Sequence, residues 1–82
     1  MKILVSVFVP AIGETYDVLI PDFLPVEEVI PLLVNDIEFL SNNRYISTGQ
    51  ELLCQRETNT VFSASESLGA YHLKNGEQLA LI

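Results

Sequence analysis

The fold is decided by residues 15–37, which read TYDVLIPDFLPVEEVIPLLVNDI. At the start of this segment Tyr16, Val18 and Ile20 alternate with their neighbours and fall on one side. A period of two is typical of a β-strand with one buried face, because successive side chains of a strand point to opposite faces. The segment therefore begins with a predicted strand at residues 15–20.

The same segment predicts an amphipathic helix at about residues 26–40. Pro21 and Pro25 end the strand, because proline withdraws a backbone donor and holds the preceding residue extended. Pro31 lies too deep in the helix for a first-turn proline, so we expect a kink or a local 3₁₀ turn near it. The apolar residues recur with helical spacing and form one stripe: Val26, Val29, Ile30, Leu33, Ile37 and Leu40.

A second strand precedes this segment. Residues 2–9 read KILVSVFV, which is rich in β-branched side chains, and residues 10–13 read PAIG. Proline and glycine interrupt the run, since proline withdraws a donor and glycine permits a positive φ. Two β-rich runs joined by a short Pro/Gly connection predict an antiparallel hairpin.

After the helix the sequence predicts loops and short strands. We expect a loop at residues 41–50, from which Tyr45 and Ile46 fold back onto the core. Asn75 and Gly76 together are a strong turn signal. The elements expected after the loop are a strand at 51–57, a turn at 58–60, a minimal edge strand at 61–62, a turn-rich crossing around Leu68, Tyr71 and Leu73, and a strand at 78–82.

This order of elements predicts an α+β fold of the β-grasp (ubiquitin-like) type. The hairpin cannot bury both of its faces, so one face takes the amphipathic helix. The final strand enters beside the first, and their parallel pairing requires the long connection that this chain has. We therefore expect a mixed sheet with one main helix packed on one face. Because 82 residues have room for one core, residues 1–82 are expected to form a single domain.

Composition excludes several classes of function. Four Lys plus Arg against eleven Asp plus Glu give a net charge of −7, which phosphate would repel, so nucleic acid is not expected as a partner. The longest apolar run, residues 3–12, is shorter than the roughly 20 residues of a membrane-spanning helix, so we expect no membrane insertion. A single cysteine excludes a disulfide scaffold and a Cys-rich zinc site.

Side chains suited to catalysis, to a cofactor or to a metal are scattered along the chain. Cys54 has no CxxC partner and alternates with Leu52 onto the predicted core face, where a structural role is expected. His72 has no second His or Cys nearby and is expected to be an exposed turn residue. The carboxylates are dispersed, and the glycines form no phosphate loop. We therefore expect a protein that is not an enzyme, with no catalytic residue, cofactor site or metal site.

The predicted alternation leaves an apolar patch on the sheet face away from the helix, where a protein partner could bind. One face is expected to hold Ile3, Val5, Val7, Tyr16, Val18, Ile20, Leu52, Cys54, Leu79 and Leu81 as core. The other face then carries the candidate interaction patch, which consists of Leu4, Phe8, Leu19, Leu53, Ala80 and Ile82. The alternative is that the register of a strand is shifted by one residue, which would place some of these side chains in the core.

Leu32 and Phe39 form a secondary candidate. Both lie off the main stripe of the helix at about 100° per residue. They are expected either to meet a partner or to pack under the loop that contains Tyr45 and Ile46.

Residues 15–37 resemble the corresponding segment of the YukD/EsaB proteins, which are small ubiquitin-like components of Gram-positive type VII (WXG100/ESAT-6) secretion systems. The shared features are a strand of the T-Y-D type, a proline bend, and Leu24-Pro25-Val26 at the start of the helix. The segment is also similar to the cytosolic ubiquitin-like domain of EccD, a membrane component of mycobacterial systems. Residues 68–81 resemble the ending of ubiquitin-like domains generally.

The resemblance implies a bacterial, cytoplasmic accessory subunit, peripheral to a membrane secretion complex, that docks or regulates by protein contact. The implied partners are components of the secretion apparatus, and self-association is also compatible with an apolar patch. Because the sequence reaches Ile82 without the two terminal glycines of ubiquitin-like modifiers, we expect no conjugation. The alternatives are a free-standing β-grasp adaptor in another complex, or a modifier or sulfur carrier if the encoded chain extends beyond Ile82.

Overall fold

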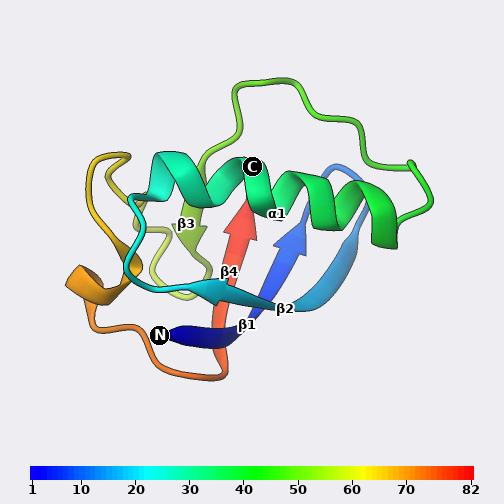
Figure 1. Cartoon of the computed structure of the whole chain (residues 1–82). Coiled ribbons are helices and arrows are strands. Elements are labelled where there is room, and N and C mark those ends of the chain that lie inside the picture. The colour runs from blue at the N-terminus through cyan, green and yellow to red at the C-terminus, as the bar shows by residue number, and fades with distance from the viewer.

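The computed structural model describes residues 1–82. Its sheet has the strand order β2-β1-β4-β3, and helix α1 covers one face (Figure 1). β1 and β4 run parallel, whereas the two outer strands are antiparallel to their neighbours, so the predicted β-grasp architecture is confirmed. The elements are β1 (Lys2–Val9), β2 (Glu14–Pro21), α1 (Val26–Leu40), β3 (Leu53–Gln55), the 3₁₀ helix η1 (Leu68–Tyr71) and β4 (Glu77–Leu81).

β1 and β2 form the predicted hairpin. The chain turns at Gly13, whose φ is +66° and whose N–H donates to the Val9 carbonyl at 2.9 Å. A positive φ favours glycine at this position. Ile3 lies opposite Ile20, and both are buried against the helix, which defines the inner face of the sheet.

The core lies between α1 and the inner face of the sheet. Branched aliphatic side chains fill it, as expected for close packing between one helix and one sheet. Leu68 of η1 closes the core after the long connection from β3. The largest fully buried side chains are Ile20, Leu33, Ile37, Leu53, Leu68, Leu79 and Leu81.

Helix α1 begins against backbone rather than against a capping side chain. Pro25 at its N-terminus makes no side-chain cap. Instead the N–H groups of Val26 and Glu27 donate to the carbonyls of Glu66 and Ala64, at 2.8 and 3.0 Å. These bonds satisfy two of the donors that a helix start leaves free, and they tie α1 to the segment before η1.

The helix differs from its prediction at two places. It is α-helical through Pro31, so the predicted 3₁₀ turn is wrong. Leu40 is exposed, whereas Val34 is buried and takes its place in the core stripe.

No helix of the structure combines the length and the apolar composition that a bilayer crossing needs.

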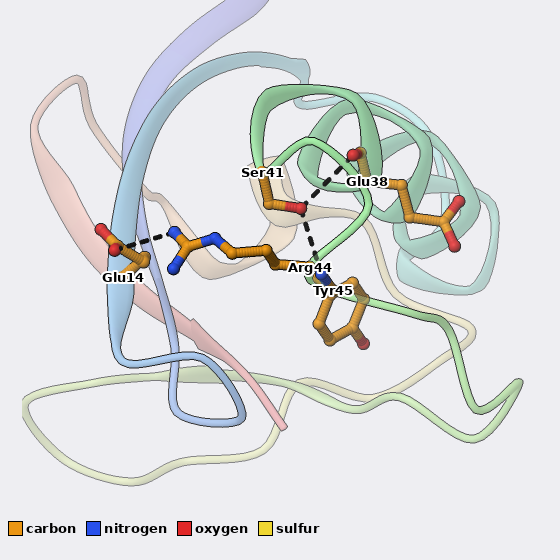
Figure 2. Close-up of polar contacts among 5 residues, drawn as sticks. All are labelled: Glu14, Glu38, Ser41, Arg44 and Tyr45. Carbon is orange, nitrogen blue, oxygen red and sulfur yellow. Dashed lines mark hydrogen bonds and ion pairs between the residues drawn. The ribbon is translucent and has the colours of Figure 1, made fainter.

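The turn after α1 is organised by the buried side chain of Ser41, as Figure 2 shows. Its hydroxyl donates to the Glu38 carbonyl at 3.3 Å and accepts the Tyr45 N–H at 3.1 Å. On the same turn Arg44 reaches the hairpin, where a guanidinium nitrogen lies 2.9 Å from the Glu14 carboxylate. The start of the 41–50 loop is thereby fixed to both the helix and the sheet.

Only one of the two loop residues predicted to fold back does so. Tyr45 is buried and belongs to the core, as predicted. Ile46 is 74% exposed, so its predicted packing is wrong. The difference follows from Ser41, which holds the backbone of Tyr45 and leaves Ile46 on the outside of the turn.

β3 is shorter than predicted and has a different register. It covers three residues rather than seven, and the expected edge strand at 61–62 is a single bridge between Val61 and Cys54. Leu53 pairs with Leu81, and both are buried, whereas Leu52 is 50% exposed. Residues paired across a sheet share a face, so Leu53 is a core residue and its placement in the interaction patch is wrong.

Candidate functional site

On the outer face of the sheet, which points away from α1, three adjacent rows of side chains contain the residues of the predicted patch that lie in β1, β2 and β4. One row pairs Leu4 with Leu19. The next consists of Asp17, Ser6 and Gln78, and the third of Thr15, Phe8, Ala80 and Cys54. Because side chains on one face recur every second residue, successive rows lie about 6.6 Å apart.

The middle row divides the predicted apolar patch. The Ser6 hydroxyl donates to the Asp17 carboxylate at 2.6 Å, and Gln78 lies beside Ser6 on the neighbouring strand. Leu4 and Leu19 are therefore separated from the third row by polar side chains. The single patch predicted across four strands is replaced by an aliphatic pair and a larger apolar surface.

The larger surface is a shallow hollow of about 550 Å³, which we name the outer hollow. Cys54 and Ala80 are buried and form its floor. Val61 and Ile82, which are 49% and 55% exposed, form part of its rim together with the half-buried Phe8. The full lining is Phe8, Pro10, Cys54, Arg56, Asn59, Val61, Ala80 and Ile82.

Arg56 is the only charged residue in the lining of the outer hollow. Its guanidinium lies over the Phe8 ring, with the guanidinium carbon 4.3 Å from the ring centroid. A cation held over an aromatic face is attracted by the negative charge of the ring surface. The hollow is thus apolar with one cation at its edge, although the chain as a whole is strongly acidic.

The prediction from sequence and the structure overlap only in part at this site. Phe8, Ala80 and Ile82 meet in the outer hollow, whereas Leu4 and Leu19 lie together beyond the polar row. Cys54 is buried as predicted but faces outward, with its Sγ 3.6 Å from the Ala80 carbonyl oxygen. Four further residues of the outer hollow were not predicted from the sequence: Pro10, Arg56, Asn59 and Val61.

A partial signal for the missed residues was present in the sequence. Once Cys54 is placed outward, the period of two carries Arg56 to the same face. Val61 carried no such signal, because it reaches the outer hollow through an isolated bridge rather than a strand.

His72 is exposed, as expected, with a left-handed φ of 57° at the end of η1.

The secondary candidate residues are accessible on α1. Phe39 is 81% exposed, so the alternative that it packs under the loop is wrong. Leu32 is also exposed. Their role as a partner surface stays a prediction.

Groups with displaced pKa values lie outside the outer hollow. Burial and the hydrogen bond to Glu51 raise the pKa of Tyr45 well above its usual range. Burial acts to raise the pKa of Glu51, but the Tyr45 hydroxyl, the Ser47 side chain and the Thr48 N–H outweigh it and lower that pKa. The Glu14 carboxylate raises the pKa of Arg44 by its hydrogen bond and its charge. Tyr45 is paired with Glu51 and Arg44 with Glu14, as in a structural network that holds a loop.

The chemistry of the outer hollow is that of a contact surface. Among its lining residues only Cys54 has a side chain that commonly binds metals, and it is buried in the floor. The rim offers aliphatic and aromatic surface beside a guanidinium. Such a mixture is typical of the anchor regions of protein interfaces.

Comparison with known families identifies the chain. The profile described as "WXG100 protein secretion system (Wss), protein YukD" matches residues 3–81. The chain belongs to the YukD family. No curated protein sequence matches this YukD-family chain.

Solved structures share the fold of this YukD-family chain. The ubiquitin-like domain of the Mycobacterium tuberculosis type VII secretion system protein EccD1 superimposes with a TM-score of 0.80 at 14% identity, covering 100% of this chain and 98% of that one. The ubiquitin-like domain of Plasmodium falciparum Dsk2 gives 0.74 at 20% identity, covering 99% and 96%. A protomer of the ESX-3 core complex gives 0.74 at 21% identity, covering 100% of this chain and 16% of that one. These likenesses show a ubiquitin-like fold.

Proposed function

We propose that this chain is a single-domain, non-enzymatic docking module of a type VII secretion system. It works at the cytoplasmic side of the membrane apparatus and binds one of its protein components through the outer hollow. The family match supports the secretion system, and solved structures with this fold include parts of ESX complexes. The observation that carries the proposal is the outer hollow itself.

The geometry of the outer hollow supports docking by side-chain insertion. Its floor is already buried, so a partner gains apolar contact chiefly at Phe8, Val61 and Ile82. Covering the exposed half of a large apolar side chain is worth roughly 1 kcal/mol. Three such side chains supply about 3 kcal/mol of the roughly 8 kcal/mol that a micromolar complex requires. The partner must therefore also engage polar groups of the rim, for which Arg56 and Asn59 are placed.

The test is a paired substitution at the rim, Phe8→Ser with Ile82→Ser, introduced into the native gene. Because Ile82 is exposed and Phe8 is half-buried, the variant is expected to keep a cooperative thermal transition. We expect it to lose co-purification with the secretion apparatus and to reduce export of a WXG100 substrate. The matched control is Leu19→Ser, an exposed leucine on the same face beyond the polar row.

Two results would overturn the proposal. One is normal export by a folded Phe8→Ser/Ile82→Ser variant. The other is an equal loss of export with Leu19→Ser, which would give the outer hollow no special role. If the double variant fails to fold, Val61→Lys replaces it, since Val61 is half exposed and lies in an isolated bridge.

Non-conjugation is tested separately by the intact mass of the chain recovered from its native cells. A mass that equals the encoded chain supports a docking module. A population joined to another protein, or carrying a terminal thiocarboxylate, would instead identify a modifier or a sulfur carrier.

A further inference from the structure

A second hollow lies on the other side of the sheet, along α1. In Figure 1 the chain between α1 and β3 runs back beside the helix. Residues of this segment and α1 residues from Val26 to Glu38 line the hollow. It has a volume of about 520 Å³, within the roughly 300–1,000 Å³ of ligand pockets. We name it the helix groove and define it by α1, residues 47–53, Phe62 and Ala64.

The helix groove has a buried apolar floor and an accessible apolar wall. Val34 and Phe62 are buried at its base. Ile30 is half-buried, whereas Pro31 and Leu52 are exposed. An inserted apolar side chain would therefore meet core residues below it and the apolar surface of Ile30 and Pro31 beside it.

The charge around the helix groove has one sign. Glu27, Glu38 and Glu51 line it, and no Lys or Arg does. Two of these carboxylates are held in place, because Glu38 accepts the Ser47 N–H at 3.2 Å and Glu51 accepts the Thr48 N–H at 2.9 Å. The groove thus presents fixed negative charge beside apolar surface, which complements a cationic apolar ligand.

We propose that the helix groove binds a short segment of a protein partner in which a large apolar side chain is flanked by Lys or Arg. A second copy of this chain fits poorly, because each copy carries a net charge of −7 and only four Lys plus Arg. The helix groove is lined by α1 on the inner side of the sheet, whereas the floor of the outer hollow is formed by the outward-facing Cys54 and Ala80. The two sites therefore lie on opposite sides of the sheet. The module can therefore hold two protein segments at once, and the two sites can be tested independently.

The probe is a fluorescein-labelled synthetic peptide in which leucines alternate with pairs of lysines. Its counterpart has glutamate at each lysine. Fluorescence anisotropy measures affinity, and amide chemical shifts of the ¹⁵N-labelled chain locate the site. We expect the lysine peptide to bind and to shift the amides of Val34, Ser47 and Leu52. The glutamate peptide is expected not to bind, because the groove would repel it.

Matched variants separate the helix groove from the general attraction of an acidic protein for a basic peptide. Glu27→Gln and Glu28→Gln change the net charge equally, and both residues are exposed on the first turn of α1, but only Glu27 lines the groove. We expect Glu27→Gln to weaken binding about threefold and Glu28→Gln to leave it within error. Ile30→Ala should weaken it about threefold, whereas Leu32→Ala, at an exposed leucine of the same helix outside the groove, should not.

Three results would overturn the inference. They are equal weakening by Glu27→Gln and Glu28→Gln, shifts concentrated at Phe8 and Ile82, and no binding of the lysine peptide at millimolar concentration. The Phe8→Ser/Ile82→Ser variant is expected to bind the peptide normally. Failure of the outer hollow as a docking site is thus distinguishable from failure of the helix groove.

Discussion

Arg56 lies over the aromatic ring of Phe8, with 4.3 Å between the guanidinium carbon and the ring centroid. The contact joins the segment after β3 to β1 across the intervening β4. Exposed cation–π pairs are worth about 0.5–1 kcal/mol. We expect Arg56→Ala to lower the free energy of unfolding by about that amount in urea titrations, and Arg56→Lys to restore part of it. An unchanged stability of Arg56→Ala would mean that the pair contributes nothing in solution.

Adjacent leucines should respond in opposite ways to the same substitution. Leu53 is 1% exposed and pairs with the buried Leu81, whereas Leu52 is half exposed. Leu53→Ala is expected to cost about 2–5 kcal/mol, because truncation of a buried leucine leaves a cavity. Leu52→Ala is expected to cost less than about 1 kcal/mol. Denaturant unfolding of the two variants measures both values, and the reverse order would restore the register predicted from sequence.

The hydrogen bond from the Tyr45 hydroxyl to the Glu51 carboxylate, 2.7 Å long, should make part of the stability depend on pH. The pKa of Glu51 is lowered in the folded state from its usual 4.5. Its stabilising contribution is therefore complete above pH 4.5 and is lost as the pH falls through the folded pKa.

Tyr45→Phe tests this dependence. At pH 7 it should lower the free energy of unfolding by about 1 kcal/mol, and this difference from the native protein should shrink as the pH is lowered toward 3. Guanidinium titrations at a series of pH values give the difference directly. A difference that stays constant with pH would exclude the Glu51 carboxylate as the partner that matters.

Pro31 should reduce the stability of α1. It lies inside the helix, where proline removes one hydrogen bond and is about 3 kcal/mol less favourable than alanine. Part of this cost is offset because proline also restricts the unfolded chain. We expect Pro31→Ala to raise the free energy of unfolding by about 1–2 kcal/mol in urea, against about 0.5 kcal/mol for Asn35→Ala on the same helix. A loss of stability would show that the core requires a bend at Pro31.

The hairpin and α1 could be predicted because their periodicities are unambiguous. Along residues 2–9 every second side chain is apolar on the inner face, and α1 repeats its stripe over several turns. The same alternation predicted three outward-facing apolar residues of the outer hollow, namely Phe8 of β1, Ala80 of β4 and Ile82 directly after β4. These features depend on local spacing alone.

The register of β3 could not be predicted in this way. Leu52, Leu53 and Cys54 are all apolar, so alternation fits either face equally well. The register is decided by partners distant in sequence, above all the two hydrogen bonds that join Leu52 to Ile82, at 2.8 and 2.9 Å. Val61 enters the outer hollow for the same reason, through its bridge to Cys54. Half of the residues that line the outer hollow, those between positions 54 and 61, therefore depend on long-range pairing for their place.

The position of β4 has a consequence for synthesis of the protein. β4 is synthesised after the other three strands of the sheet, yet it lies between β1 and β3. A nascent chain that ends before Glu77 has the hairpin and the helix but lacks the strand that joins them to β3, so its unpaired β1 edge stays open. Because such non-local pairing must wait for both strands, the sheet closes only after residue 81 has left the exit tunnel. A partner that binds the outer hollow, which Ala80 of β4 helps to line, thus recognises chains in which β4 is already inserted and passes over shorter nascent chains.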